Sequence, residues 1–147
     1  MTDNNNNNTL SNEITTDREL NDWGNRNIKG FSGVYSRTEF PNVYPFMGPG
    51  DSVIINLDPA YSTGGTHWVA LRASSEAPIV YYKDSFGAPP PQDIVSTIQD
   101  RGLMYCNNID QKLDEQNCGK RSARFLWRMA KSAKKGHEIE SFIASEM

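Results

Sequence analysis

The sequence of 147 residues contains only two cysteines, Cys106 and Cys118. Two cysteines are too few for a disulfide framework, and these two lack the paired spacing of a zinc site. We therefore expect free thiols in a reducing compartment, with Cys106 in a structural role and no bound metal.

Long apolar runs are also missing. No segment approaches the ~20 residues that a membrane span needs, and the first residues lack the basic and apolar regions of a signal peptide. The sequence also has no large excess of charge of one sign, because 15 Lys and Arg nearly balance 18 Asp and Glu, for a net charge of -3. We expect a chain that is neither secreted nor membrane-embedded, and no bulk charge that demands nucleic acid.

The chain begins with an asparagine tract, residues 4–8, that cannot bury apolar surface to offset the entropy of ordering. We predict a disordered tail over residues 1–13 and one domain over residues 14–147, because this length supports a single core. The capping-box spacing of Thr16 and Glu19 predicts a short helix at the start of the domain.

Hydrophobic periodicity predicts the elements that follow. Strands are expected at 53–57, 67–72, 78–84 and 103–106, and helices at 92–100, from 118 onward and after 136. Strands mixed with unevenly placed helices, without a regular βαβ rhythm, indicate an α+β domain.

The strands at 67–72 and 78–84 read as a hairpin. A turn centred between Ser75 and Glu76 would pair Ala73 with Pro78 and would place His67 directly opposite Asp84. Directly opposed residues point to the same face with Cβ atoms roughly 4.5 to 5.5 Å apart, so this register brings an imidazole and a carboxylate together. A slip of one residue would separate them.

Cys118 stands at the predicted start of a helix, where unpaired N–H groups and the helix dipole favour a thiolate. Gly119 would let the backbone bend tightly and leave the Cys118 amide free to face an oxyanion, and Gln111 on the approach loop could supply a second donor. Together with His67 and Asp84 these residues would form an activated nucleophile.

Each residue also has an ordinary explanation. Taken singly, a cysteine is commonly a small buried apolar residue, an aspartate before Ser-Phe-Gly a turn residue and a glutamine plain loop polarity. Their order along the chain, and the hairpin that pairs two of them, favour the catalytic interpretation. His137 matches no motif and is not expected to be catalytic.

Four segments, "GGTHWVAL", "YYKDSFG", "DQKLDEQNCG" and the helix after it, resemble the motifs of adenain-like cysteine proteases, which are related to SUMO-deconjugating peptidases. The resemblance runs from about Val53 to the helix after Cys118. It implies an adenain-like α+β fold in which Cys118 is the nucleophile, His67 the general base, Asp84 its orienting acid and Gln111 the side-chain oxyanion donor.

The resemblance also implies a function. We expect a thiol endopeptidase, encoded by a virus or mobile element, that processes capsid or core precursor polypeptides after Gly-Gly or Gly-X-Gly sites. It would act as a monomer in the virion and the host-cell cytoplasm, without a required cofactor. A peptidase for SUMO-like or ubiquitin-like modifiers and a non-catalytic binding module that keeps the protease fold are the alternatives.

The sequence departs from the family pattern at several positions. Glu115 stands where such proteases often have a serine, and Lys120 and Arg121 replace apolar residues, which predicts a more exposed helix start. The chain is shorter than adenain, so no activating-peptide docking site or cofactor disulfide is carried over, although a peptide or nucleic-acid activator stays open. Trp68 matches the tryptophan beside the family's histidine, where it could shield the reacting pair or simply pack.

The last long helix carries a cationic side. This side consists of Lys120, Arg121, Arg124, Arg128, Lys131 and Lys135. Such residues can neutralise phosphates, and adenovirus-type proteases use nucleic acid as a cofactor, so a weak contact with DNA or another polyanion is one interpretation. The acidic composition favours the other, a solvated helix face.

Overall fold

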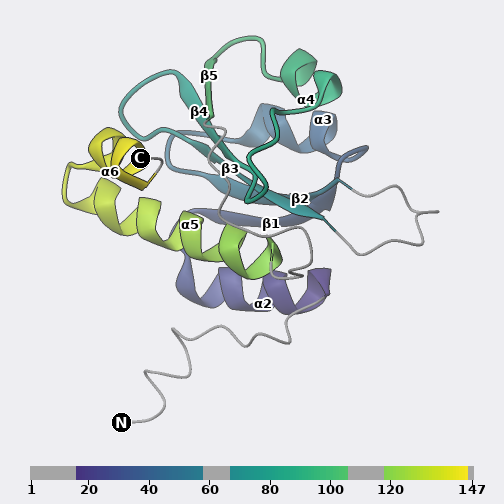
Figure 1. The fold of residues 1–147 in the computed structure, drawn as a ribbon, viewed down its shortest axis with the longest axis horizontal. Helices are drawn as coiled ribbons and strands as arrows, with labels where there is room; N and C mark the ends of the chain where they lie inside the picture. The colour runs from purple at the N-terminus through teal and green to yellow at the C-terminus, as the bar shows by residue number, and fades with distance from the viewer. Residues whose placement is uncertain (1–15, 58–66, 106–117, 146–147) are drawn as a thin grey trace, which may run out of the picture.

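The computed structural model describes residues 16–57, 67–105 and 118–145, and its centre is a five-stranded sheet with helices on both faces (Figure 1). The elements, in chain order, are α2 (Asp17–Asn27), β1 (Phe31–Ser36), α3 (Phe40–Val43), the 3-10 helix η1 (Tyr44–Phe46), β2 (Ser52–Asn56), β3 (Trp68–Ala73), β4 (Ile79–Lys83), α4 (Gln92–Thr97), β5 (Gly102–Tyr105), α5 (Cys118–Lys134) and α6 (Glu138–Ser145). This arrangement confirms the predicted α+β class.

The sheet is mixed, with strand order β1-β2-β3-β4-β5. Its two outer pairs, β1 with β2 and β4 with β5, are parallel, whereas β2–β3 and β3–β4 are antiparallel. Strand β3 is therefore the central strand, and all six of its residues are buried. Strand β3 pairs with β2 from Trp68 to Arg72 and with β4 from Ala70 to Ala73.

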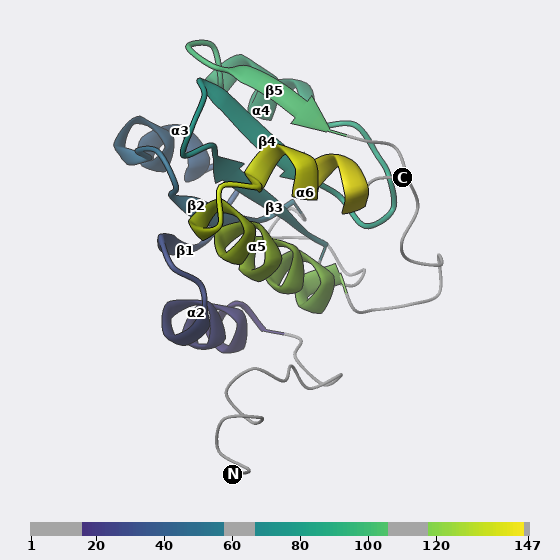
Figure 2. The same cartoon turned by 90° about the vertical axis from the view of Figure 1, so that its left-hand side faces the viewer.

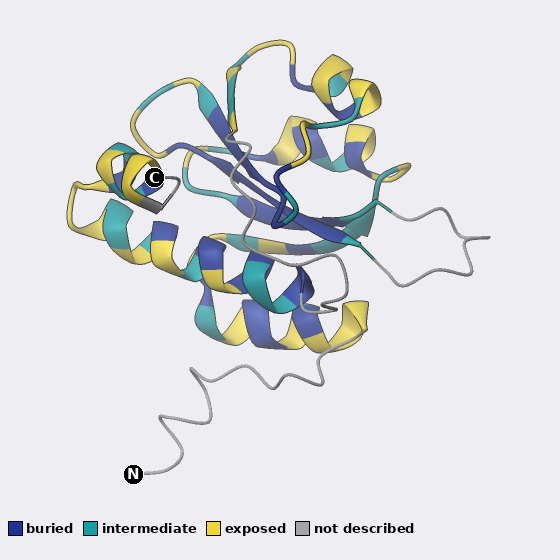
Figure 3. Ribbon diagram, viewed as in Figure 1, coloured by how far each residue is buried: buried dark blue, intermediate teal, exposed yellow. Residues whose placement is uncertain are grey.

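Side chains alternate between two cores, one on each face of the sheet. Ile54, Ala70 and Tyr81 pack against α2, α5 and α6, whereas neighbouring residues of the same strands pack against α3, η1 and α4. Figure 2 shows α5 lying across the sheet with α2 beside it, and Figure 3 shows that the strands between the helices are the most deeply buried part of the molecule.

Helix α2 begins as the sequence predicts. The Thr16 hydroxyl accepts a hydrogen bond from the Glu19 amide at 3.1 Å and donates one to the Glu19 carboxylate at 2.9 Å. Leu20 and Trp23 are buried on the inner side of the helix. The capping interactions and this apolar stripe together fix where the helix starts and which side faces α5 and the sheet.

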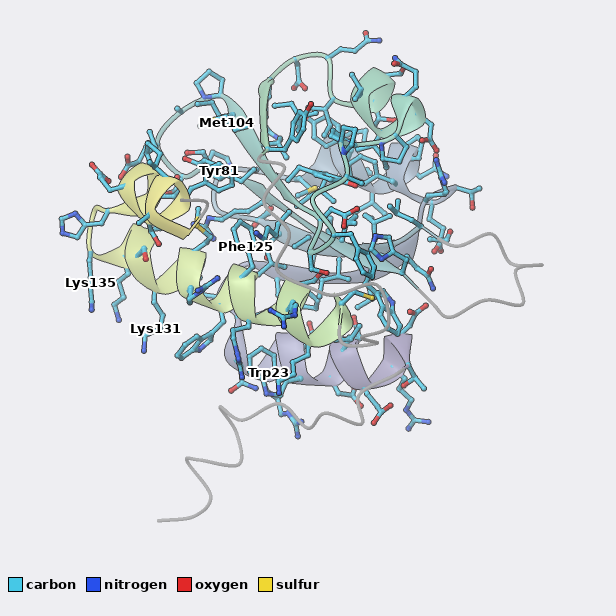
Figure 4. All side chains as sticks on the ribbon, in the orientation of Figure 1. Trp23, Tyr81, Met104, Phe125, Lys131 and Lys135 are labelled. Atoms are coloured by element: carbon cyan, nitrogen blue, oxygen red, sulfur yellow. The ribbon has the colours of Figure 1, made fainter. Side chains whose placement is uncertain are left out.

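Helix α5 has the predicted two-sided character. Phe125, Leu126 and Met129 are buried, and Phe125 points toward the sheet whereas Lys131 and Lys135 point away from it (Figure 4). Within the cationic side, Arg124, Arg128, Lys131 and Lys135 are exposed, and Lys120 and Arg121 are half-buried and engaged in contacts. The predicted exposed helix start is wrong for Cys118 and Gly119, which are both buried.

The predicted hairpin register is wrong by two residues. Ala73 pairs with Val80 and Ala70 with Lys83, instead of Ala73 with Pro78. Pro78 has no amide N–H to offer β3, and its carbonyl accepts a hydrogen bond from Gly102 in the neighbouring β5 at 2.8 Å. The connection is therefore longer than predicted, and β4 starts only at Ile79.

A buried carboxylate holds this longer turn. Glu138 of α6 is fully buried and accepts hydrogen bonds from the Arg72 guanidinium at 2.7 Å, from the Ser74 hydroxyl and from the Ser75 amide. Burial alone would raise the pKa of Glu138, but the hydrogen bonds from Ser74 and Arg72 hold it below its ordinary value. Residues 64 positions apart along the chain thus set the hairpin together.

Two other sequence predictions concern the N-terminal tail and membrane-spanning segments. The predicted disordered tail, residues 1–13, lies outside the described residues and stays a prediction. Among the helices of residues 16–57, 67–105 and 118–145, none combines the length and apolar character that crossing a membrane requires.

Replacing the buried carboxylate should destabilise the fold strongly. Glu138→Ala leaves the Arg72 guanidinium buried without its partner, so we expect the free energy of unfolding to fall by about 3 to 5 kcal/mol. Urea denaturation at neutral pH measures this change. Glu140→Ala is the matched control, since Glu140 is exposed on the same helix and should cost less than about 0.5 kcal/mol. Equal losses in the two variants would contradict the structural role of Glu138.

Candidate active site

The turn that follows β4 fixes the orientation of Asp84. The carbonyl of Asp84 accepts a hydrogen bond from the Gly87 amide at 2.9 Å, and Gly87 adopts a φ of 76°, which glycine tolerates best. One carboxylate oxygen, Oδ1, accepts a hydrogen bond from the Phe86 amide at 2.8 Å. The residue is 3% exposed, so its other oxygen is held in a fixed direction inside the protein.

That second oxygen meets His67. The Nε2 atom of His67 lies 3.0 Å from Oδ2 of Asp84, and the imidazole ring stacks against Phe86 with 5.2 Å between ring centroids. A two-residue shift of register leaves both side chains on the same face of the sheet. His67 and Asp84 both lie just beyond the paired residues of β3 and β4, so Asp84 reaches the imidazole from the turn after β4, and Phe86 of the same turn packs on the ring. The predicted pairing of the two groups is confirmed, although by a different register.

The imidazole is held in its charged form. Burial lowers the pKa of His67, but hydrogen bonding and charge from Asp84 and Cys118 outweigh it and raise the pKa to about 10. Because the ordinary value is 6.5, His67 carries a proton at neutral pH in the folded protein. An imidazolium beside a thiol favours the thiolate, which is the reactive form of cysteine.

Cys118 is the first residue of α5, and its side chain is 3% exposed. The backbone amide of Trp68, the residue next to His67, donates a hydrogen bond to the sulfur at 3.4 Å. Nδ1 of His67 is buried, and Cys118 lies near enough to the imidazole to raise its pKa. Nε2 of His67 therefore contacts the carboxylate, and Cys118 acts on the same imidazole.

Gly119 serves a different purpose from the one predicted. It lies inside the first turn of α5, where no sharp bend is required. A Cβ atom at this position would lie 2.8 Å from Cε3 of Trp68 and 2.9 Å from Cδ1 of Leu20. The glycine is needed because it lets the start of the helix press directly against Trp68, and this brings Cys118 to the end of β3.

The structure therefore brings together three of the four predicted site residues, His67, Asp84 and Cys118. The fourth, Gln111, lies outside the described residues, as does Cys106. Across the described ranges, no three His, Cys, Asp or Glu side chains converge in a way that could hold a metal ion.

Sequence reasoning missed two contributions to the site. The backbone amide of Trp68 contacts the sulfur, and the indole N–H of Trp68 donates to Oδ1 of Asp17 at 2.6 Å. The adjacency of Trp68 to His67 was a usable signal for the first contact. No local pattern indicates the second, because Asp17 lies 51 residues away at the start of α2.

The charged state of His67 can be measured by NMR titration of its imidazole. The wild-type protein should titrate near a pKa of 10, and Asp84→Asn or Cys118→Ala should lower this value because each removes a group that favours the proton. Since the folded pKa is raised, the stabilisation is present below about pH 6.5 and is lost as the pH rises through about 10. A wild-type pKa near 6.5 would contradict the charged pair.

No protein-family model matches the sequence, and no curated protein matches it. The fold is similar to that of the ASFV pS273R protease, with a TM-score of 0.61 and 15% sequence identity over 88% of this chain. A second crystal structure, of the selenomethionine form of that protease, gives a TM-score of 0.50 at 17% identity over 88% of this chain. This chain spans 62% and 61% of the two structures. The likeness shows that the chain has a fold found in a protease.

Proposed function

We propose that this chain is a cysteine endopeptidase in which Cys118 is the nucleophile, His67 the acid and base, and Asp84 the group that orients the imidazole. One observation carries the proposal. Asp84 holds Nε2 of His67 at 3.0 Å, while the same imidazole gains basicity from Cys118 at the start of α5. A nucleophile, a base and an orienting acid in this relation are the requirements of acyl transfer.

The proposed reaction begins from the Cys118 thiolate and the His67 imidazolium. The sulfur attacks the scissile carbonyl carbon, and the carbonyl electrons move to oxygen to give a tetrahedral oxyanion. The Cys118 amide, in the first turn of α5, and the Gln111 side chain would stabilise this oxyanion. Collapse breaks the C–N bond as His67 gives its proton to the leaving amine.

The first half of the reaction leaves a thioester on Cys118 and a neutral imidazole. Water then attacks the thioester carbonyl while His67 takes a proton from it. A second tetrahedral oxyanion collapses and expels the sulfur, releasing the carboxylic acid product. The proton that His67 gained restores the imidazolium, so thiolate and imidazolium are both regenerated and no other reactant is needed.

The substrate class in the proposal is a viral precursor polypeptide, such as a capsid or core precursor cleaved after Gly-Gly or Gly-X-Gly. The likeness to the ASFV protease supports a viral setting, although this chain spans only 62% of that protein. Small residues before the scissile bond suit a nucleophile whose side chain is 3% exposed, because a bulky residue would be hindered from reaching it. The virion and the host-cell cytoplasm are the locations that this role requires.

A peptidase for SUMO-like or ubiquitin-like modifiers is the second candidate, because it would use the same three groups. An electrophilic probe built on such a modifier and a capsid precursor separate the two functions. Cleavage of the precursor supports our proposal, whereas an adduct on Cys118 with the modifier probe and no precursor cleavage would replace it with the alternative. A non-catalytic binding module would give neither result.

A polyanion contact through α5 is a subsidiary part of the proposal. Arg124, Arg128 and Lys131 are exposed on the helix, and together with Lys135 just beyond it they could contact phosphates. The Lys131 ammonium also lies 4.5 Å from the centroid of the Trp127 ring. A DNA or peptide activator would act in addition to the three groups of the site, and we propose a monomer that needs no other cofactor.

Removing the thiol should abolish processing. In an assay of precursor cleavage, Cys118→Ala is expected to lose all turnover above background, because no covalent intermediate can form. Cys106→Ala is the matched control, since it removes the other thiol and should retain wild-type activity. Full activity of Cys118→Ala would overturn the proposed function.

Gln111 is predicted to act only in the transition state. Gln111→Ala should lower kcat by roughly 10²-fold, the effect of removing one oxyanion donor. KM should change little, because the ground-state carbonyl carries no full negative charge. Steady-state kinetics on a peptide substrate measure both constants, with Gln116→Ala as the control at a second glutamine of the segment before Cys118. Unchanged kcat would remove Gln111 from the mechanism.

A further inference from the structure

Trp68 is held at three places by groups from two helices, α2 and α5. Its indole N–H donates to Asp17 of α2 at 2.6 Å, its backbone amide donates to the sulfur of Cys118 at 3.4 Å, and its carbonyl accepts from Ser122 of α5 at 3.1 Å. Its ring also packs against Gly119, where no Cβ atom would fit. The position of this one residue therefore sets the position of the amide that contacts the sulfur.

We infer that Asp17 is a positioning residue for the nucleophile, acting through Trp68 and coupling helix α2 to the site; this inference rests on the proposed function. Asp17 does not contact the sulfur itself. Its carboxylate binds the indole N–H of Trp68, and the backbone amide of Trp68 contacts the sulfur of Cys118. A hydrogen bond to an ionised acceptor is stronger than one between neutral groups, so this contact can select one indole orientation.

Another tryptophan shows that the contact is not required merely to satisfy a buried indole. Trp23 is 5% exposed, and its indole N–H forms no hydrogen bond with the described residues. Trp68 is buried to a similar degree, at 3% exposed, yet its indole N–H donates a hydrogen bond to the Asp17 carboxylate in the first turn of α2. The indole N–H of Trp23 in α2 is thus buried without a hydrogen bond to the described residues, whereas that of Trp68 beside the site has a carboxylate partner.

The chemical consequence concerns the thiolate. A backbone N–H aimed at the sulfur stabilises the negative charge, and displacement of Trp68 would weaken that interaction. Partial loss of this hydrogen bond should slow the reaction of the sulfur with an electrophile about threefold to tenfold at neutral pH. The same displacement changes nothing at high pH, where the thiol is ionised in every variant.

The test is the pH profile of Cys118 alkylation by iodoacetamide, followed by mass spectrometry on folded protein. Asp17→Ala should lower the rate about threefold to tenfold at pH 7 and converge with the wild type at high pH. Asp17→Asn keeps an acceptor oxygen and should restore most of the rate. Asp22→Ala is the matched control, because Asp22 is exposed on the same helix and forms no hydrogen bond with the described residues.

Trp68→Phe gives an independent measurement, because it removes the indole N–H and keeps an aromatic ring. Adding Asp17→Ala to Trp68→Phe should slow alkylation no further, since the contact is already gone. A purely structural role for Asp17 would lower the thermal stability and leave the pH profile of the folded protein unmoved. Coincident profiles for wild type and Asp17→Ala, or additive effects in the double variant, would overturn the inference.

Failure of the proposed function would look different. In that case Cys118→Ala would leave precursor processing intact, while the alkylation profile could still depend on Asp17. The two measurements therefore separate the coupling of α2 to the sulfur from the use to which the sulfur is put.

Discussion

The hydrogen bond between His67 and Asp84 is the contact on which the account of the site depends. It joins the residue before β3 to the residue after β4, so it exists only if the central hairpin and the turn at Gly87 both form correctly. Asp84 is buried and already accepts the Phe86 amide, which leaves one oxygen free to hold the imidazole. A rigid carboxylate is what keeps His67 in its charged form and in one orientation.

The second constraint is the close packing of α5 on the end of β3. Gly119 lets the helix start approach Trp68, and this approach places the sulfur of Cys118 beside the Trp68 amide and within the influence of the imidazole. The helix N-terminus, the strand end and the turn therefore converge at one corner of the sheet. The hydrophobic core shared by α2, α5 and the sheet supports that convergence, because it buries Leu20 and Phe125 together on one face of the sheet.

The elements that the sequence predicted follow local periodicity, whereas β1, α3 and η1 were not predicted. The β-branched run of β2, the two-sided character of α5 and the Thr16 cap are properties of short segments. The hairpin register could not be predicted, because Glu138 and the pairing of Pro78 with β5 decide it, and both come from distant parts of the chain. The predicted contact between His67 and Asp84 still forms, because a shift by an even number of residues keeps both side chains on the same face of the sheet.

The candidate site was predictable to the same extent. The residue types and their order indicated His67, Asp84 and Cys118, but the reason for Gly119 and the contact from Asp17 depend on tertiary packing that no spacing encodes. Local sequence thus identifies the groups that would react. Their mutual orientation is set by contacts between residues fifty or more positions apart, and those contacts are visible only in the folded chain.

The central claim is that folding makes Cys118 a reactive thiolate, and competition between the two thiols of the native protein tests it most directly. Native protein is treated with limiting iodoacetamide at neutral pH, and the modified peptides are quantified by mass spectrometry. The account predicts that Cys118 is alkylated well before Cys106 despite its burial, and that unfolding the protein removes the difference. Equal rates in the native protein, or faster labelling of Cys106, would contradict the account.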